Sequence, residues 1–251
     1  LWRHIRNHEI GAVDSLLLTY TKTLERYLSE SARSINEVAA NRVDRTYWWI
    51  THNKETYDEI IVDEAQDVES SRYELLKQYS NSICYSADDQ QILFPNRATT
   101  ESQLEVLFSN NEKYYLDENF RNTYEIMHFV RSLFPNRLIT QDMLNNLLEE
   151  NRRGNKPILI VVDGIITSEI DVIIDIINEF RSETHNIAIL VPLVKNVNYY
   201  FGELQNRGLD CSKFVNDDVE LDSIENVHIT TFKSAKGIEF DTVIIPNFHN
   251  M

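Results

Sequence analysis

Short apolar runs rich in β-branched residues alternate along the chain with stretches whose apolar residues recur at helical spacing. This alternation is typical of βαβ units and predicts an α/β fold with mainly parallel sheets. The clearest helical spacing is that of Ile170, Ile173, Ile174 and Ile177. We expect strands at 15–20, 57–62, 82–87, 113–116, 158–162, 187–191, 227–231 and 242–245. We expect helices at 1–8, 22–37, 70–79, 123–133, 141–150, 168–182 and 196–207.

A polar stretch with glycine and proline, 151–157, is the clearest punctuation between two such series. The patterns before and after it predict two α/β lobes in tandem, with the changeover between residues 116 and 157. We place the first lobe at 1–116 and the second at 117–251. The chain has no repeat of fixed period, which excludes a solenoid.

The composition narrows the class of protein. Hydrophobic residues make up 42% of the 251, enough for packed cores, which excludes wholesale disorder. With Cys84 and Cys211 as the only cysteines, we expect no disulfide framework and a reducing, cytoplasmic location. No apolar run reaches the roughly 18 residues of a membrane span, so no membrane is expected as a partner. The net charge of −16 argues against a generally basic surface but leaves room for a local basic channel.

The sharpest chemical signal is a pair of carboxylates, Asp63 and Glu64, directly after the apolar run 57–62. In open α/β sheets, ligands bind beyond the carboxyl ends of the strands, which is where these side chains are expected. One carboxylate can hold Mg²⁺ and the other can orient and deprotonate a water. The structural alternative is an acidic first turn of the following helix.

Several segments together resemble the ordered motifs of superfamily 1 helicases of the UvrD/Rep type. Asp63–Asp67 (DEAQD) resembles the Walker B motif, and Asp88–Ile92 (DDQQI) resembles motif III. The remaining matches are Leu17–Leu24 (LLTYTKTL) to motif Ia, Leu116–Arg121 (LDENFR) to motif IV and Thr230–Phe240 (TTFKSAKGIEF) to motif V. The resemblance implies two tandem RecA-like lobes that hydrolyse ATP with Mg²⁺ and move along single-stranded DNA, or act at a single-strand/duplex junction, with 3′-to-5′ polarity.

The resemblance also implies roles for individual residues. Asp63 would hold Mg²⁺, Glu64 would activate water, and Gln90 and Arg121 would act at the γ-phosphate. Gly237 and Glu239 would contact the nucleotide. The residues expected to contact the single strand are Thr19, Tyr20, Lys22, Thr231, Lys233 and Lys236.

Each of these residues also has an ordinary structural explanation. Arg121 alone would be a surface arginine paired with Glu118 or Glu125, and Gly237 a turn glycine. For Trp48 and Trp49, core packing is the expected role, with base stacking as the alternative.

The chain departs from the family pattern in several places. No Gly-Lys-Ser or Gly-Lys-Thr of a phosphate-binding loop occurs, and the chain stops before a motif VI. We therefore expect the chain alone to be inactive and the complete protein to be the enzyme. The usual motif III aspartate is either replaced by Ala87 or shifted to Asp88, and Lys233 stands where motif V usually has histidine.

Segment lengths leave no room for large accessory domains, because the stretch from Thr23 to Asp63 is short and that from Arg121 to Thr231 accommodates one lobe. We therefore expect a compact translocase or helicase. The alternative is a non-catalytic nucleic-acid-binding or scaffolding module that has lost the phosphate loop. A third alternative, disfavoured for want of nearby His or Lys, is a metal-dependent nuclease built on Asp63, Glu64, Asp67, Asp88 and Asp89.

Overall fold

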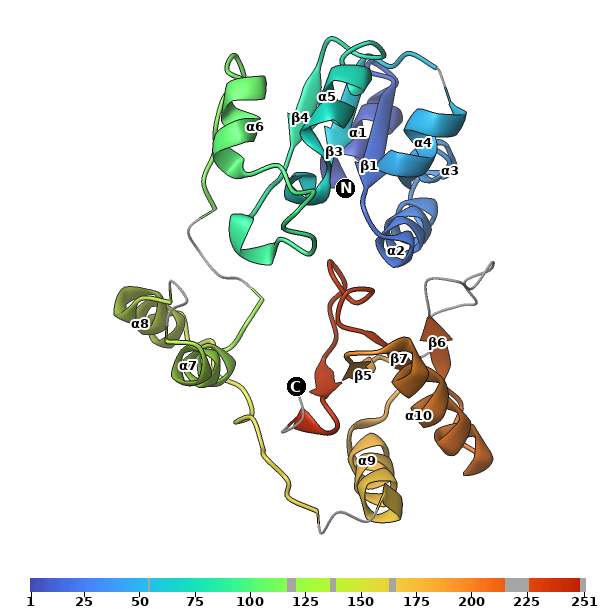
Figure 1. Cartoon of the computed structure of the whole chain (residues 1–251), viewed down its shortest axis with the longest axis vertical. Coiled ribbons are helices and arrows are strands. Elements are labelled where there is room, and N and C mark those ends of the chain that lie inside the picture. The colour runs from blue at the N-terminus through green and yellow to red at the C-terminus, as the bar shows by residue number, and fades with distance from the viewer. Residues whose placement is uncertain (54, 117–120, 136–138, 163–165, 215–225, 249–251) are drawn as a thin grey trace. The chain divides into compact units, whose positions relative to one another are not determined.

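The computed structural model describes residues 1–53, 55–116, 121–135, 139–162, 166–214 and 226–248 (Figure 1). It forms two compact units. The larger unit combines Leu1–Asn110 with Ile165–Met251, and the smaller one is Asn111–Gly164.

The first sheet of the larger unit has four parallel strands in the order β2-β1-β3-β4. They are β1 (Ser15–Thr19), β2 (Val43–Arg45), β3 (Glu59–Val62) and β4 (Ile83–Tyr85). Its helices are α1 (Trp2–Ile10), α2 (Lys22–Arg33), α3 (Glu37–Ala40), α4 (Thr46–His52), α5 (Ser70–Leu76) and α6 (Glu101–Leu107). Short 3₁₀ turns cover Ala65–Asp67 and Asp89–Gln91.

Helices cover both faces of this sheet. Leu16 and Leu18 of β1 pack in one cluster with residues of α4, α5 and α6, while Leu17 packs in another with Leu24 and Leu28 of α2. Since alternate strand residues point to opposite faces, β1 is buried on both. This explains its uninterrupted apolar sequence.

The second sheet has four parallel strands in the order β6-β7-β5-β8. They are β5 (Ile187–Val191), β6 (Ser212–Phe214), β7 (Val227–Thr231) and β8 (Thr242–Ile244). Two helices, α9 (Ile166–Phe180) and α10 (Val194–Asn206), supply core residues. Ile170, Ile173 and Ile177 of α9 are buried and Ile174 packs beside them, so the predicted apolar stripe is confirmed.

The smaller unit contains α7 (Tyr124–Leu133) and α8 (Gln141–Glu149). Met127, Leu144 and Leu147 form its buried cluster.

The predicted α/β class with parallel sheets is confirmed, but two expected strands are wrong. Residues 113–116 and 158–162 form no strand, and Leu116, Ile158 and Val161 are 96%, 80% and 85% exposed. Their β-branched and aromatic side chains favour a strand only where a partner and a covering layer exist. The short β2 and β6 and the helices α4 and α6 were not predicted. The structure separates 111–164 as a unit of its own. The predicted lobe boundary at 116/117 is not tested by this division and stays a prediction.

Within the described residues, no helix is long and apolar enough to cross a membrane.

Candidate functional site

The candidate site begins where β3 ends. Asp63 N donates to Leu18 O at 2.8 Å and Ala65 N donates to Ser86 O at 2.9 Å, so neighbouring strands hold the backbone on either side of Glu64. Glu64 itself has φ 56° and ψ 43°, in the left-handed region. A non-glycine residue there costs about 1–2 kcal/mol. Backbone strain of this kind persists where the surrounding structure holds the residue in place, and it clusters at active sites and ligand-binding sites.

The Asp63 carboxylate is half-buried at the carboxyl end of β3, as predicted from the sequence. Its Oδ1 accepts from Ser86 Oγ at 2.5 Å and from Glu64 N at 3.1 Å. Both hydrogen bonds end on the same oxygen, which directs Oδ2 elsewhere. Among the described residues, no group of three or more His, Cys, Asp and Glu could hold a metal ion. A single carboxylate suits Mg²⁺, which keeps much of its water and takes one or two protein ligands.

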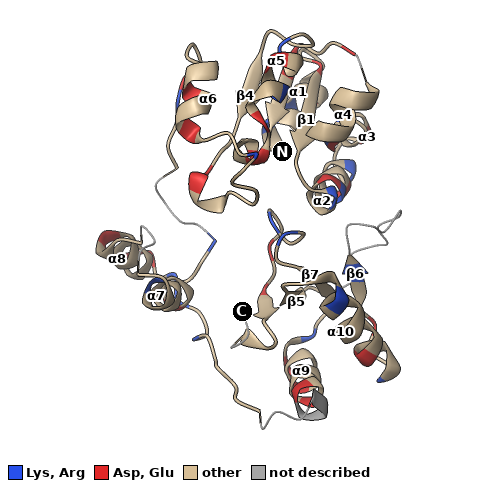
Figure 2. Ribbon diagram, in the orientation of Figure 1, with Lys and Arg blue, Asp and Glu red and all other residues tan. Residues whose placement is uncertain are grey.

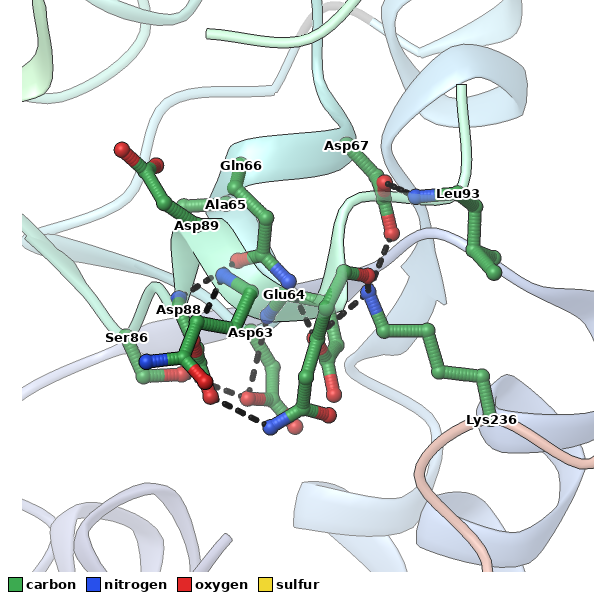
Figure 3. Close-up of polar contacts among 12 residues, drawn as sticks. Asp63, Glu64, Ala65, Gln66, Asp67, Ser86, Asp88, Asp89, Leu93 and Lys236 are labelled. Atoms are coloured by element: carbon green, nitrogen blue, oxygen red, sulfur yellow. Dashed lines mark hydrogen bonds and ion pairs between the residues drawn. The ribbon is translucent and has the colours of Figure 1, made fainter. Parts of the chain in front are cut away.

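Glu64 is held through one of its carboxylate oxygens. Oε2 accepts from Gln66 Nε2 at 2.5 Å and lies 3.0 Å from Lys236 Nζ (Figure 3). The Gln66 side chain is fully buried, and its Oε1 accepts from Asp88 N at 3.1 Å. Gln66 therefore links the Walker B-like segment to the motif III-like segment.

Asp67 is also buried, with a side chain that is 0% exposed, and it is charge-paired. Lys236 Nζ lies 2.5 Å from Asp67 Oδ2, and Leu93 N donates to Oδ1 at 2.8 Å. Lys236 comes from the turn after β7, so the motif V-like and Walker B-like segments are in direct contact. The lysine was expected on a nucleic-acid strand; the structure places its ammonium against carboxylates.

Asp88 organises the 3₁₀ turn at Asp89–Gln91. Its carboxylate accepts from Gln90 N at 2.8 Å and from Gln91 Nε2 at 2.7 Å. Asp89 and Glu101 exchange hydrogen bonds, each carboxylate accepting the other's backbone N–H. Gln90 is the middle residue of this turn and is exposed. Its proposed contact with the γ-phosphate stays a prediction.

The other residues expected to contact single-stranded nucleic acid divide into a buried group and a group that reaches the surface. Thr19 is fully buried, and Thr231 is 8% exposed with its hydroxyl donating to Ser234 Oγ at 3.0 Å. The side chains of Tyr20, Lys22 and Lys233 reach the surface at least in part. Lys22 Nζ lies 5.9 Å from the centre of the Phe214 ring.

Phe94 lies against two of the residues that reach the surface, Tyr20 and Lys233. It was not identified from the sequence. Its ring centre lies 5.7 Å from that of Tyr20 and 4.6 Å from Lys233 Nζ. Burial, with a smaller contribution from Asp67, raises the pKa of Tyr20. The one available signal was an aromatic residue shortly after Gln90.

Trp48 and Trp49 were expected in the core, and only one is there. Trp49 is 1% exposed, whereas Trp48 is 46% exposed and stacks on His52 with ring centres 3.7 Å apart. Consecutive residues on a short helix point in different directions, so a pair of tryptophans is rarely buried as a unit.

The predicted nucleotide contacts lie at the end of the turn after β7. Gly237 has φ 81°, and a Cβ built there would lie 2.7 Å from Leu24 Cδ2. The left-handed backbone favours glycine at this position, and a Cβ would also have to displace the end of the Leu24 side chain. Glu239 is exposed. Contact of either residue with a nucleotide stays a prediction.

Arg121 is exposed and belongs to the smaller unit. Residues 117–120 of its motif lie outside the described residues. Its predicted role at a γ-phosphate stays a prediction.

Tyr73 of α5 is hydrogen-bonded to the backbone of the site. Its hydroxyl donates to Ala65 O at 2.6 Å, and burial raises the pKa of this phenol well above its ordinary value. The hydroxyl therefore stays protonated and able to donate at any physiological pH.

The basic residues near the site sit on an acidic chain. Figure 2 shows aspartate and glutamate positions, in red, on many elements. The turn after β7 carries two lysines, Lys233 and Lys236, three positions apart. Lys236 is neutralised by its partners and Lys233 is exposed. This turn therefore presents a local cation despite the net charge of −16.

Comparison with known proteins finds a viral relative. The chain is 24% identical over 209 residues to a protein of Acanthamoeba polyphaga mimivirus named "Putative ATP-dependent DNA helicase R568". The match covers 76% of this chain but only 29% of the viral protein. No family model matches the chain.

Among solved structures, S. cerevisiae Dbp5 bound to RNA and ADP BeF3 aligns with 92% of this chain and 61% of its own chain. The TM-score is 0.45 and the identity 12%. The similarity to the viral protein supports a helicase-like class for this chain.

Proposed function

We propose that this chain is part of an ATP-dependent motor on single-stranded nucleic acid, with two RecA-like lobes that hydrolyse ATP. The observation that carries the proposal is the carboxylate pair at the end of β3, where Gln66 links Glu64 to the segment of Asp88. The similarity to a viral protein named as a DNA helicase supports DNA as the substrate. The 3′-to-5′ polarity rests on the resemblance of the motifs alone.

Asp63 would hold Mg²⁺, because its carboxylate is a hard oxygen ligand and both of its described hydrogen bonds use Oδ1. When bound, Mg²⁺ would neutralise charge on the β- and γ-phosphate oxygens. Ser86 and the backbone of Glu64 fix the orientation of the carboxylate. Asp63 thus needs no rearrangement of its own to present an oxygen.

Glu64 would act as the general base. The water oxygen bonds to the γ-phosphorus as the bond from that phosphorus to the β–γ bridging oxygen breaks, and the electron pair leaves with ADP. Glu64 takes the proton from the attacking water and returns it to the released phosphate. Gln90 and Arg121 would stabilise the γ-phosphate oxygens, and Gly237 and Glu239 would lie against the nucleotide.

The nucleic-acid strand would bind at Tyr20, Phe94 and Lys233. Two aromatic side chains with a cation 4.6 Å from one ring centre match the stacking and phosphate contacts of single-strand binding. Lys22 would contribute from a neighbouring position. Thr231, whose hydroxyl donates to Ser234 Oγ, would contribute by holding the turn that carries Lys233. Thr19, which is fully buried, would support Tyr20 from beneath.

The test is ATP hydrolysis by the full-length protein, with and without oligo(dT), beside Glu64→Gln. We expect DNA to stimulate hydrolysis, and the variant to lose at least about 100-fold in kcat. Glu74→Gln, a surface carboxylate of α5, is the matched control and keeps the wild-type rate. Oligo(U) in place of oligo(dT) tests the choice of DNA over RNA. Strand binding without any hydrolysis would instead support the non-catalytic binding module.

A further inference from the structure

Lys236 has a saturated set of partners. An ammonium group has three donors, and Nζ lies 2.5 Å from Asp67 Oδ2, 2.6 Å from Gln91 O and 3.0 Å from Glu64 Oε2 (Figure 3). The side chain is only 7% exposed. In this arrangement no donor remains for the phosphate of a nucleic-acid strand.

The partners of Lys236 have different surroundings. Asp67 is fully buried and accepts a second hydrogen bond from Leu93 N, so it anchors the lysine. Glu64 is 17% exposed, and its described contacts, Lys236 and Gln66, both lie at Oε2. Two donors on one carboxylate oxygen, together with the left-handed backbone of Glu64, fix where Oε1 points.

We propose that Lys236 is a positioning residue of the hydrolytic site: anchored on Asp67, it holds Glu64 Oε2 so that Oε1 meets the attacking water. The inference rests on the proposed function, because it assigns to Lys236 a part in the hydrolysis proposed for Glu64. It also separates two lysines of one turn. Lys233, exposed beside Phe94, serves the strand, while Lys236 serves the carboxylates.

The burial and the number of partners of Lys236 favour a positioning role over simple charge balance. A buried ion pair gives little net stability, because desolvation offsets the attraction between the charges. A lysine that only neutralised Asp67 would not need a third partner on the carboxylate proposed as base. Geometry is the more sensitive quantity, since a displacement of about 1 Å at a reacting group can lower a rate about 100-fold.

The experiment compares ATP hydrolysis and oligo(dT) binding for the full-length protein and three variants. Lys236→Met keeps the aliphatic stem and removes the ammonium. Asp67→Asn/Lys236→Met also removes the buried carboxylate charge, so it stays folded if the single variant does not. Lys195→Met, on an exposed position of α10, is the matched control and keeps wild-type values.

We expect both Lys236 variants to lower kcat about 10- to 100-fold, with the KM for ATP and the Kd for oligo(dT) changed less than about three-fold. A double variant with wild-type kcat would show that Lys236 only balances Asp67, and would overturn the inference. A weakened Kd for oligo(dT) with unchanged kcat would overturn it in favour of a strand contact. An inactive wild-type protein would reject the proposed function itself, a result that the wild-type measurement shows before any variant is compared.

Discussion

Gly237 and Leu24 approach each other so closely that a Cβ on the glycine would lie 2.7 Å from Leu24 Cδ2. The contact joins the turn after β7 to α2, and the glycine has φ 81°. Two separate penalties therefore attach to any side chain at position 237, one from the backbone and one from the neighbour.

Gly237→Ala should lower the free energy of unfolding by more than the roughly 1–2 kcal/mol of left-handed strain alone. Gly208→Ala is the matched control, because Gly208 has φ 76° but nothing within 4 Å of a built Cβ. Urea unfolding of both variants measures the difference. Equal losses would mean that Leu24 moves aside at no cost.

Phe94→Ala should weaken binding of oligo(dT) by about 1–3 kcal/mol, because it removes an aromatic stacking surface. Lys233→Met should weaken binding as well and should reduce the slope of log K against log salt concentration by about one. Fluorescence titrations at several salt concentrations measure both effects. An unchanged salt slope in Lys233→Met would remove this lysine from the strand contact.

His228 should make stability depend on pH. The ring is buried and Nδ1 lies 2.7 Å from Ser212 Oγ, and burial lowers the pKa of His228 to about 4. The unfolded histidine, with a pKa near 6.5, binds a proton that the folded one excludes. Stability is therefore greatest above pH 6.5 and falls as the pH drops from 6.5 towards 4, by up to about 1.4 kcal/mol per pH unit.

Urea unfolding of wild type and His228→Gln at pH 7, 6 and 5 tests this dependence. His4, whose pKa burial also lowers to about 4, contributes a similar slope that remains in the variant. We expect the variant to lose part of the slope. Identical slopes would show that His228 does not resist protonation in the folded state.

Arg3→Ala should destabilise the protein by about 1–2 kcal/mol, because it leaves the buried carboxylate of Glu59 without its cation, although the arginine itself is 65% exposed. Arg3 donates to both Glu59 oxygens, at 2.6 and 2.9 Å, and Asn7 adds a third hydrogen bond at 2.9 Å. Arg3→Ala/Glu59→Gln removes the unpaired charge and should recover much of the loss in thermal unfolding. No recovery would assign the effect to packing of the arginine stem.

The sequence predicted the strands whose side chains are buried on both sides. The expected strands 187–191 and 227–231 match β5 and β7 residue for residue. Every residue of β5 is apolar, and every residue of β7 except His228 is β-branched. Residues 158–162 have the same composition and form no strand. The local sequence pattern indicates that a segment can form a strand, but it does not indicate whether a neighbouring strand is present to pair with it.

The site shows the same division between local and long-range information. Asp63 and Glu64 follow a recognisable strand, so their position beyond the end of β3 could be predicted. The contact between Lys236 and Asp67 joins residues 169 positions apart, and no local pattern specifies it. Phe94 was missed because its neighbours Tyr20 and Lys233 come from distant segments.

The left-handed backbone of Glu64 sets folding and chemistry against each other at one position. Glycine or asparagine would occupy that conformation with less strain than glutamate does. Selection for stability alone would therefore tend to replace Glu64, whereas selection for turnover would keep it. A library randomised at position 64 and sorted once for folding and once for hydrolysis should diverge in composition, which would make that residue a direct record of what the protein has been selected to do.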